Sequence, residues 1–349
     1  MKKNVIIIGA ILVVLIIAWI INLLWAAGQF KTLKPHFTGT CTPVSGLVGA
    51  EDITIHPITG VAYISAYNRR AVMSGEVVES GIYAYDLNDP SPKLTRLVAK
   101  TSQEFRPHGI SLFVGKNGND RLFVINHAQE KHSIEMFDLS DGQLTFSGST
   151  ENRLIVSPND LVAVGPNSFY VTNDHKNRGG IKGMLEDYLR LEWSNVVFCQ
   201  DKECSIAITD FGYANGINVS RDRKTLYLST TTQQTLFAYD RNPKTNQLSL
   251  LNKISTGTGL DNIEIDECGR IWVGAHPQML KFISHAKDKN QLSPSQILRY
   301  SFSRQNGFES EEIYLNLGDE ISTSSVGAFK NNRLLMGSVF EPKILDCKF

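Results

Sequence analysis

Short polar pairs stand directly before apolar, strand-like segments at five places in this sequence. They are Glu51-Asp52 before ITI, His108-Gly109 before ISLF, Asn159-Asp160 before LVAV, Asn215-Gly216 before INVS and Asp261-Asn262 before IEI, whereas a sixth segment, VGAF, follows Ser324-Ser325. Carboxylate and carboxamide oxygens suit Ca²⁺, which takes about 6 to 8 oxygen ligands, whereas zinc favours clustered His and Cys. If these pairs meet in space, calcium binding is the chemistry that they favour.

The elements that must position these pairs recur along the chain as units of short strands. The second strand of each unit is the clearest: GVAYIS from Gly60, RLFVIN from Arg121, SFYVTN from Ser168, TLYLST from Thr225, RIWVGA from Arg270 and RLLMGS from Arg333. Third strands are expected at GIYAYDL, SIEMFDL, NVVFC, QTLFAYD, MLKFI and KILDCKF. Six units of about 45 to 65 residues predict an all-β, six-bladed β-propeller, with a β-sandwich as the alternative.

In a propeller the first strand of each blade lines the central channel, so the polar pairs would form a ring at one mouth. Because neighbouring strands are antiparallel, the ends of the second strands return to the same face. That face would then also receive His127, Asn173-Asp174-His175 and His276. The competing explanation is that Asn and Asp merely favour turns before strands, although turn preference explains less well why five pairs share one blade position.

The N-terminal segment from Val5 to Ala27 carries no charge. At about 1.5 Å per residue its helix would reach roughly 34 Å, enough to cross a membrane. A cleaved signal peptide is the alternative, because Ala26-Ala27-Gly28 could form a cleavage site, but the apolar run is longer than the usual about 7 to 15 residues. We therefore expect an uncleaved anchor in residues 1–30 with a cytoplasmic N-terminus, and a propeller in residues 31–349 on the periplasmic, lumenal or extracellular side.

Charge and cysteine content agree with this placement. Lysine plus arginine equal aspartate plus glutamate at 35 each, so no overall field favours nucleic acid as a partner. Five cysteines fit an oxidising compartment. Cys41 and Cys347 bracket the globular part and are placed to link the first and last blades, and Cys199 and Cys204 flank a turn that would suit a cross-strand bridge.

The chain resembles the paraoxonase/arylesterase family in several segments that occur in family order. These are GAEDITI, RPHGISLF, LFVINH, PNDLVAVGPNSFYVTNDH, YANGINVS, LDNIEID and IWVGAHP. The resemblance implies a calcium-dependent six-bladed propeller that acts on lactones and aryl esters, with two calcium sites. It assigns the catalytic calcium to Glu51, Asn159, Asn215, Asp261 and Asn262, and the structural calcium to Asp52, Asp160 and the backbone carbonyl of Ile110.

The same resemblance implies the roles of the remaining polar residues. His108 and His127 match a histidine dyad proposed to activate water, Asp174 and His276 match residues of the substrate site, and Cys41 and Cys347 match the family's disulfide. Without the resemblance, each lone histidine would be read as an ordinary hydrogen-bonded residue.

Three features depart from the family pattern. Ala275 stands where many relatives carry a free cysteine, which disfavours a thiol mechanism, and the insertion from Tyr67 to Ser80 leaves substrate preference open. A second insertion, Lys176 to Glu192, predicts a short helix over the active-site face, with apolar residues at helical spacing: Ile181, Met184, Leu185, Tyr188 and Leu189. Such a helix normally packs on the body of the protein, and here it is a candidate lid or membrane-facing wall.

Together the sequence predicts a hydrolase in which calcium polarises the carbonyl of a small lipophilic lactone or ester for attack by water. His108, oriented by His127, is the candidate base, with Glu51 or Asp261 as the alternative. The sequence contains no G-x-S-x-G or H-E-x-x-H motif. The alternative function is a calcium-stabilised propeller that binds a ligand or protein without chemistry.

Overall fold

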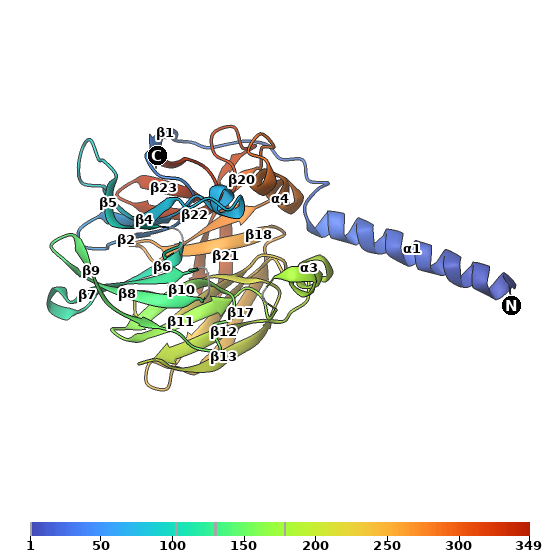
Figure 1. Ribbon diagram of the computed structural model, residues 1–349, viewed down its shortest axis with the longest axis horizontal. Coiled ribbons are helices and arrows are strands. Elements are labelled where there is room, and N and C mark those ends of the chain that lie inside the picture. The colour runs from blue at the N-terminus through green and yellow to red at the C-terminus, as the bar shows by residue number, and fades with distance from the viewer. Residues whose placement is uncertain (1, 102–103, 129–130, 178) are drawn as a thin grey trace.

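The computed structural model is a six-bladed β-propeller with one long N-terminal helix projecting from it (Figure 1). It describes residues 2–101, 104–128, 131–177 and 179–349. Met1 of the expected anchor and Arg178 of the second insertion lie outside these ranges. Within them, six antiparallel sheets of four strands each confirm the predicted blades, and they exclude a sandwich.

Blades one to five each contain four consecutive strands. Blade one is β2 (Ala50–Ile55), β3 (Val61–Ala66), β4 (Glu79–Asp86) and β5 (Thr95–Thr101), and blade two is β6 (Pro107–Phe113), β7 (Asp120–Asn126), β8 (Ser133–Ser140) and β9 (Gln143–Thr150). Blade three is β10 (Pro158–Gly165), β11 (Ser168–Asn173), β12 (Ser194–Gln200) and β13 (Glu203–Phe211). Blade four is β14 (Ala214–Val219), β15 (Thr225–Thr230), β16 (Thr235–Arg241) and β17 (Leu248–Ser255), and blade five is β18 (Gly259–Ile265), β19 (Ile271–His276), β20 (Ser295–Ser303) and β21 (Gly307–Asn316).

The sixth blade joins the two ends of the propeller. Its inner strands β22 (Ser324–Lys330), β23 (Arg333–Ser338) and β24 (Lys343–Lys348) come from the C-terminus, and its outer strand β1 (Thr40–Ser45) comes from the N-terminal side. Cys41 pairs with Cys347 in the β1–β24 register, and the two are joined by the predicted disulfide. Cys199 and Cys204 form a second disulfide between β12 and β13.

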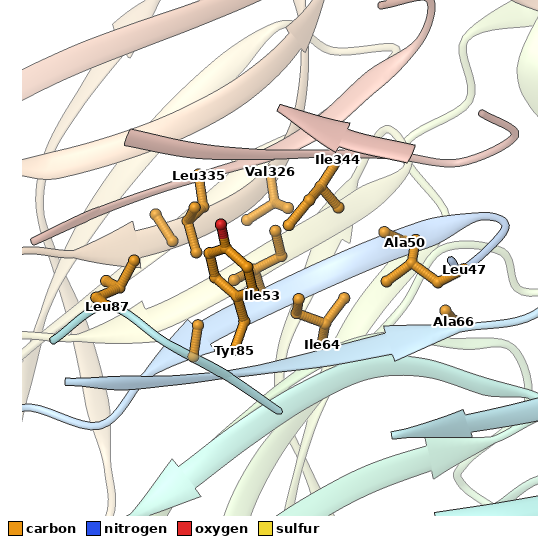
Figure 2. Packing of buried hydrophobic residues seen from close by; sticks show 12 residues of the cluster. Leu47, Ala50, Ile53, Ile64, Ala66, Tyr85, Leu87, Val326, Leu335 and Ile344 are labelled. Atoms are coloured by element: carbon orange, nitrogen blue, oxygen red, sulfur yellow. The ribbon is translucent and has the colours of Figure 1, made fainter. Parts of the chain in front are cut away.

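Apolar side chains fill the space between neighbouring blades. Figure 2 shows the junction that closes the ring, where Ile53 and Ile64 of blade one face Val326, Leu335 and Ile344 of blade six. All five of these side chains are fully buried. Equivalent clusters lie at the other junctions, so each blade contributes one face to each of two neighbours.

One predicted strand is wrong. The segment MLKFI was expected to be the third strand of blade five, but it begins the helix α4 (Met279–Lys287), and β20 is the third strand. Met279, Phe282 and Ile283 recur at helical spacing and face a common pocket. A run of five apolar or mixed residues is compatible with a strand or with a helix. In this segment the apolar residues recur at the helical period, and the segment is a helix.

The described residues form three further α-helices and a short 3-10 helix at Lys116–Gly118. The predicted insertion helix is α3 (Gly180–Leu189), and α2 (Arg69–Met73) lies in the first insertion. Asn68 caps α2, because its side chain accepts a hydrogen bond from the backbone N–H of Ala71 at 3.1 Å. The long helix α1 (Lys2–Ala26) projects from the side of the propeller where α3 and α4 lie (Figure 1).

The end of α1 is fixed to the propeller. The Gln234 side chain donates to the carbonyl of Ala26 at 2.6 Å, and the backbone N–H of Met279 donates to the carbonyl of Ala27 at 3.0 Å. These bonds satisfy carbonyls that a helix C-terminus leaves without partners. By length and composition α1 can span a membrane, and a signal sequence meets the same criteria.

The disulfide that closes the ring is expected to matter more than the one within blade three. In the loop-entropy description, the cross-link between residues 306 apart contributes about 5 kcal/mol, and the one between residues 5 apart contributes about 2 kcal/mol. Replacing Cys41 and Cys347 by alanine should therefore lower the free energy of unfolding more than replacing Cys199 and Cys204. Denaturant unfolding of the two double variants measures the difference, and equal losses would contradict this ranking.

Candidate calcium site and substrate pocket

Every innermost strand carries a β-bulge at its polar residues. The register with the second strand shifts between Ala50 and Asp52, Pro107 and Ile110, Pro158 and Leu161, Ala214 and Ile217, Leu260 and Ile263, and Ser324 and Val326. A bulge places extra residues on one strand and redirects their side chains. The predicted pairs therefore lie at one position of each blade because the strand is bulged there.

Four oxygens of this ring have no hydrogen-bond partner among the described residues. They are buried, and they belong to four of the five side chains expected to bind the catalytic calcium: Glu51 Oε2, Asn159 Oδ1, Asn215 Oδ1 and Asn262 Oδ1. Burying an acceptor without a partner costs about 1 to 3 kcal/mol, and more for a charged group. A cation would satisfy all four, so this set of residues fits calcium.

The amide nitrogens of the three asparagines explain why their oxygens face inward. Asn262 Nδ2 donates to Glu51 Oε1 at 2.8 Å, and Asn159 Nδ2 donates to Asp174 Oδ2 at 3.3 Å. Asn215 Nδ2 donates at 2.9 Å to the Thr231 hydroxyl, whose own proton goes to the Leu260 carbonyl. Since each nitrogen faces an acceptor, each oxygen is turned away from its partner and toward the channel.

The fifth expected ligand, Asp261, is positioned by a histidine. His276 Nε2 lies 2.8 Å from Asp261 Oδ2, and His276 packs against Phe282 of α4 with ring centroids 4.4 Å apart. No three His, Cys, Asp or Glu side chains in the described ranges are arranged to hold a metal by themselves. A cation at this mouth would therefore depend on the carboxamides, as an oxygen-rich calcium site does.

Asp52 and Asp160 occupy the second position of their pairs, and each contacts the inner strand of the next blade. Asp52 accepts hydrogen bonds from the N–H groups of Ile53 and Ile110, and Asp160 accepts them from Leu161 and Ile217, all at 2.7 to 2.8 Å. Burial raises the pKa of Asp52 to about 7 and raises that of Asp160 well above its usual range. Two carboxylates buried so close together fit the second, structural cation that the sequence suggested.

Glycine follows the polar residue in blades two and four for a steric reason. A Cβ on Gly109 would lie 2.6 Å from the Asn159 carbonyl oxygen, and one on Gly216 would lie 2.5 Å from that of Asp261. Both distances are too short for any other residue. The pairs His108-Gly109 and Asn215-Gly216 thus let a neighbouring bulge approach the channel axis.

The two histidines of the expected dyad stack face to face. Their ring centroids are 4.7 Å apart and their planes differ by 18°. His127 Nε2 lies 2.7 Å from the Pro158 carbonyl, and His108 Nε2 lies 3.7 Å from Glu51 Oε1. Burial is the main cause that lowers the pKa of both imidazoles, that of His127 to about 3, so both rings are neutral at neutral pH.

Asp174 is part of a chain of polar contacts that reaches α3. It accepts hydrogen bonds from the Ser157 hydroxyl and from His175 Nδ1, the latter at 2.8 Å. His175 Nε2 lies 3.0 Å from Asp187 of α3. The buried Glu186 accepts from the N–H groups of Lys176 and Asn177 and fixes the start of the insertion. The insertion helix is therefore connected to the polar ring through two residues.

A pocket of about 530 Å³ opens above the ring. Its floor contains Glu51, His108, His127, Asn159, Asp174, Asn215, Asp261 and His276, so the structure brings the predicted catalytic, substrate-binding and most calcium residues together. Its walls come from Leu23 and Ala26 of α1 with the following Ala27, Met184 and Tyr188 of α3, and Leu280, Phe282 and Ile283 of α4. The pocket is thus polar at its floor and apolar at its walls.

The sequence did not identify several residues of this pocket. Tyr213 lines it with a left-handed backbone conformation, φ 59°, which is unusual for a residue with a side chain. Its position two residues before Asn215 is the sequence signal that could have identified Tyr213 as a pocket residue. The wall residues of α4 were missed because that segment was assigned to a strand.

These features define a β-propeller with buried carboxylate and carboxamide groups at the floor of a pocket whose walls are apolar. The sequence model of the family described as Arylesterase matches residues 33–349. The chain is 32% identical to serum paraoxonase/arylesterase 2 of Rattus norvegicus, with 88% of each chain covered, and 31% identical to serum paraoxonase/arylesterase 1 of Homo sapiens, with 91% of each covered. The chain belongs to the arylesterase family and is an esterase or lactonase.

Solved structures agree with the fold at much lower identity. A luciferin-regenerating enzyme superimposes with a TM-score of 0.56 at 14% identity, covering 89% of this chain and 95% of that one. A calcium-binding regucalcin from Agrobacterium tumefaciens gives 0.53 at 16% identity, covering 89% and 93%. These likenesses establish the six-bladed architecture alone.

The contact between His175 and α3 is expected to depend on pH. Burial opposes the charged imidazole, but hydrogen bonds to Asp174 and Asp187 outweigh it and raise the pKa of His175 to about 10. Since this value is above the ordinary one near 6.5, the stabilisation is complete below about pH 6.5 and is lost as the pH rises through about 10. Hydrogen exchange of the α3 amides, corrected for intrinsic rates, should therefore accelerate above pH 9.

The Asp187→Asn variant provides the control for this dependence. It removes one of the two carboxylates that face His175. The pKa of His175 should fall, and the onset of α3 exchange should move to lower pH. An unchanged onset in the variant would show that the ion pair does not hold the helix.

Proposed function

We propose that the protein hydrolyses small lipophilic lactones and aryl esters, and that it does so with calcium bound at the floor of its pocket. The four buried oxygens without hydrogen-bond partners carry this proposal. Glu51, Asn159, Asn215, Asp261 and Asn262 would hold the catalytic ion, and Asp52, Asp160 and the Ile110 carbonyl would hold the structural one. The names of the relatives, paraoxonase, arylesterase and lactonase, support the substrate class.

Bound there, calcium would supply a Lewis acid beside the substrate carbonyl. The remaining functions, which are substrate binding and proton transfer, would be carried out by side chains of the protein. The apolar walls would bind the hydrophobic part of the substrate and exclude water, and Asp174 and His276 would line its polar end. A base must accept the proton of the attacking water, and His108, Glu51 and Asp261 are the candidates within the pocket.

We also propose that the pocket is matched to substrates that dissolve in a membrane. The wall of α1 adjoins the pocket, and α3 presents apolar side chains outward: Ile181, Met184, Leu185 and Leu189 are each about half exposed or more. The helix α1 would then anchor residues 1–30 in the bilayer with a cytoplasmic N-terminus, and residues 31–349 would form the hydrolase domain on the other side. An apolar face of this size beside a membrane helix suits contact with lipid.

Calcium dependence is tested on the full chain in detergent with a panel of lactones and aryl esters. Hydrolysis should disappear after calcium is removed with a chelator and should return when calcium is added. Activity that survives complete removal would overturn the calcium mechanism. Tight calcium binding without turnover of any substrate on the panel would instead favour a binding propeller without chemistry.

The carboxamide ligands allow a matched comparison on a single strand. Asn215→Ala removes an oxygen without a partner, whereas Asn218→Ala removes a carboxamide that is fully hydrogen-bonded to Ile263 and Val219. Asn215→Ala should weaken calcium binding by about tenfold or more, because the lost contact is to a charged group. Calorimetric titration measures both variants, and an equal effect of the two would argue against Asn215 as a ligand.

The role of α3 is tested with long-chain and short-chain lactones. The Leu185→Asp and Leu189→Asp double variant places two charges on the outer face of the helix. It should reduce hydrolysis of long-chain lactones from vesicles and leave short, soluble lactones unaffected. Ile206→Asp is the control, because Ile206 is equally exposed on the outer strand β13. Unchanged long-chain activity in the double variant would contradict the membrane-facing assignment.

A further inference from the structure

An arginine of the first insertion lies beside the histidine that was expected to act as a base. Arg69 is the first residue of α2 and is 8% exposed. Its Nη2 lies 2.8 Å from His108 Nδ1. The sequence drew attention to the insertion but gave Arg69 no role.

Three further contacts hold the guanidinium of Arg69 in this position. Its Nη1 donates to the carbonyls of Gly49 at 3.1 Å and of Val339 at 3.4 Å, and its plane covers the ring of Tyr67 at 4.1 Å. Gly49 is required there, since a Cβ on it would lie 2.4 Å from the Tyr67 carbonyl and 3.1 Å from Arg69 Nη1. Arg69 thus bridges the start of blade one and the end of blade six.

The contact with His108 has one consistent assignment of protons. A guanidinium carries donors only and stays charged in proteins. Nδ1 of His108 must therefore accept through its lone pair, and the proton of the neutral ring must be on Nε2. That nitrogen is the one that lies 3.7 Å from Glu51 Oε1, inside the pocket.

The stacked neighbour, His127, cannot fix the position of the His108 proton in the same way. His127 contacts His108 face to face, whereas a hydrogen bond between two imidazoles lies in the plane of the donor ring. His127 directs its Nε2 to the Pro158 carbonyl instead. Among the described residues, the side chain that hydrogen-bonds His108 is Arg69.

We propose that Arg69 is a positioning residue that holds His108 with its proton on Nε2, so that His108 donates a hydrogen bond to the substrate's carbonyl oxygen rather than acting as the base. The role of His108 as a hydrogen-bond donor to the substrate rests on the proposed hydrolysis, whereas the assignment of its tautomer does not. In the reaction, water forms a bond to the carbonyl carbon and its proton passes to Glu51 or Asp261. The oxyanion accepts the hydrogen bond from Nε2, the ester C–O bond then breaks, and the leaving oxygen takes the proton from the carboxylate.

Arg70 offers a matched control in the same helix. It holds α2 to the neighbouring segments through the carbonyls of Phe340 at 3.2 Å and His285 at 2.6 Å, and it stacks over Phe340. It does not line the pocket among the described residues. Replacing Arg70 therefore loosens α2 without removing the partner of His108.

The test compares Arg69→Met with Arg70→Met in the full chain. In the unchanged protein labelled with ¹⁵N-histidine, His108 should show its proton on Nε2, with His108→Gln identifying the signals. Arg69→Met should abolish this preference and lower kcat by about tenfold to a hundredfold with KM within about twofold. Arg70→Met should lower the melting temperature and leave kcat and the His108 signals unchanged.

Each outcome decides the assignment. A proton on Nδ1 in the unchanged protein would overturn it, as would equal losses of kcat in the two variants. If Arg69→Met does not fold, Arg69→Lys keeps a cationic donor, so His108 should keep its proton on Nε2, and a proton on Nδ1 in that variant would overturn the assignment. If no ester or lactone is hydrolysed at all, the proposed function fails, but the NMR signals still report whether Arg69 sets the tautomer.

Discussion

Buried oxygens that accept no hydrogen bond from the described residues lie at one mouth of the channel, and the arrangement of the six blades keeps them together. Such atoms destabilise a folded chain unless a cation or another donor meets them. The three asparagine oxygens are each held by a bulge in an innermost strand and by an amide nitrogen that has its own acceptor, and Glu51 accepts one of these amide bonds through its other oxygen. The remaining features of the site, from the glycines in blades two and four to the buried pair Asp52 and Asp160, allow the bulges to approach one another.

A ring of this kind holds its geometry only when it is closed. The apolar clusters between blades are continuous around the ring, and the one between blades six and one is built from the two ends of the propeller. Strand β1 and the Cys41–Cys347 disulfide join those ends covalently. Closure and the geometry of the polar ring are therefore coupled, since a displacement of blade one would move Glu51 away from Asn262, its partner in blade five.

The parts of the fold that depend on local patterns were predictable from the sequence. All six second strands and five of six third strands were placed correctly, because each combines β-branched and aromatic residues with a preceding turn. The polar pairs were also found, since they repeat at one position of the unit. The helix α4 was not found, because MLKFI is too short for its period to be read from apolar residues alone.

The contacts between blades were beyond sequence reasoning for a different reason. Arg69 and His108 are 39 residues apart, and Asn262 and Glu51 are 211 apart. Nothing in a single sequence states which side chains meet across such separations. The resemblance to the arylesterase family divided the ring into two expected calcium sites, but it had no counterpart for a residue in the insertion from Tyr67 to Ser80.

The floor of the pocket is built from strands and its walls from helices, and this division affects how the substrate preference of the protein can change. The floor of the pocket comes from the bulged strands, whose positions are fixed by closure, and its walls come from α1, α3 and α4, which lie outside the sheets. A change in a wall alters which hydrophobic groups fit without moving the buried oxygens. Arg69 lies outside both regions, in α2 of the first insertion, but contacts His108 of the floor. Substrate preference can therefore change freely in most of the wall, but a change in the first insertion also alters the group that orients His108.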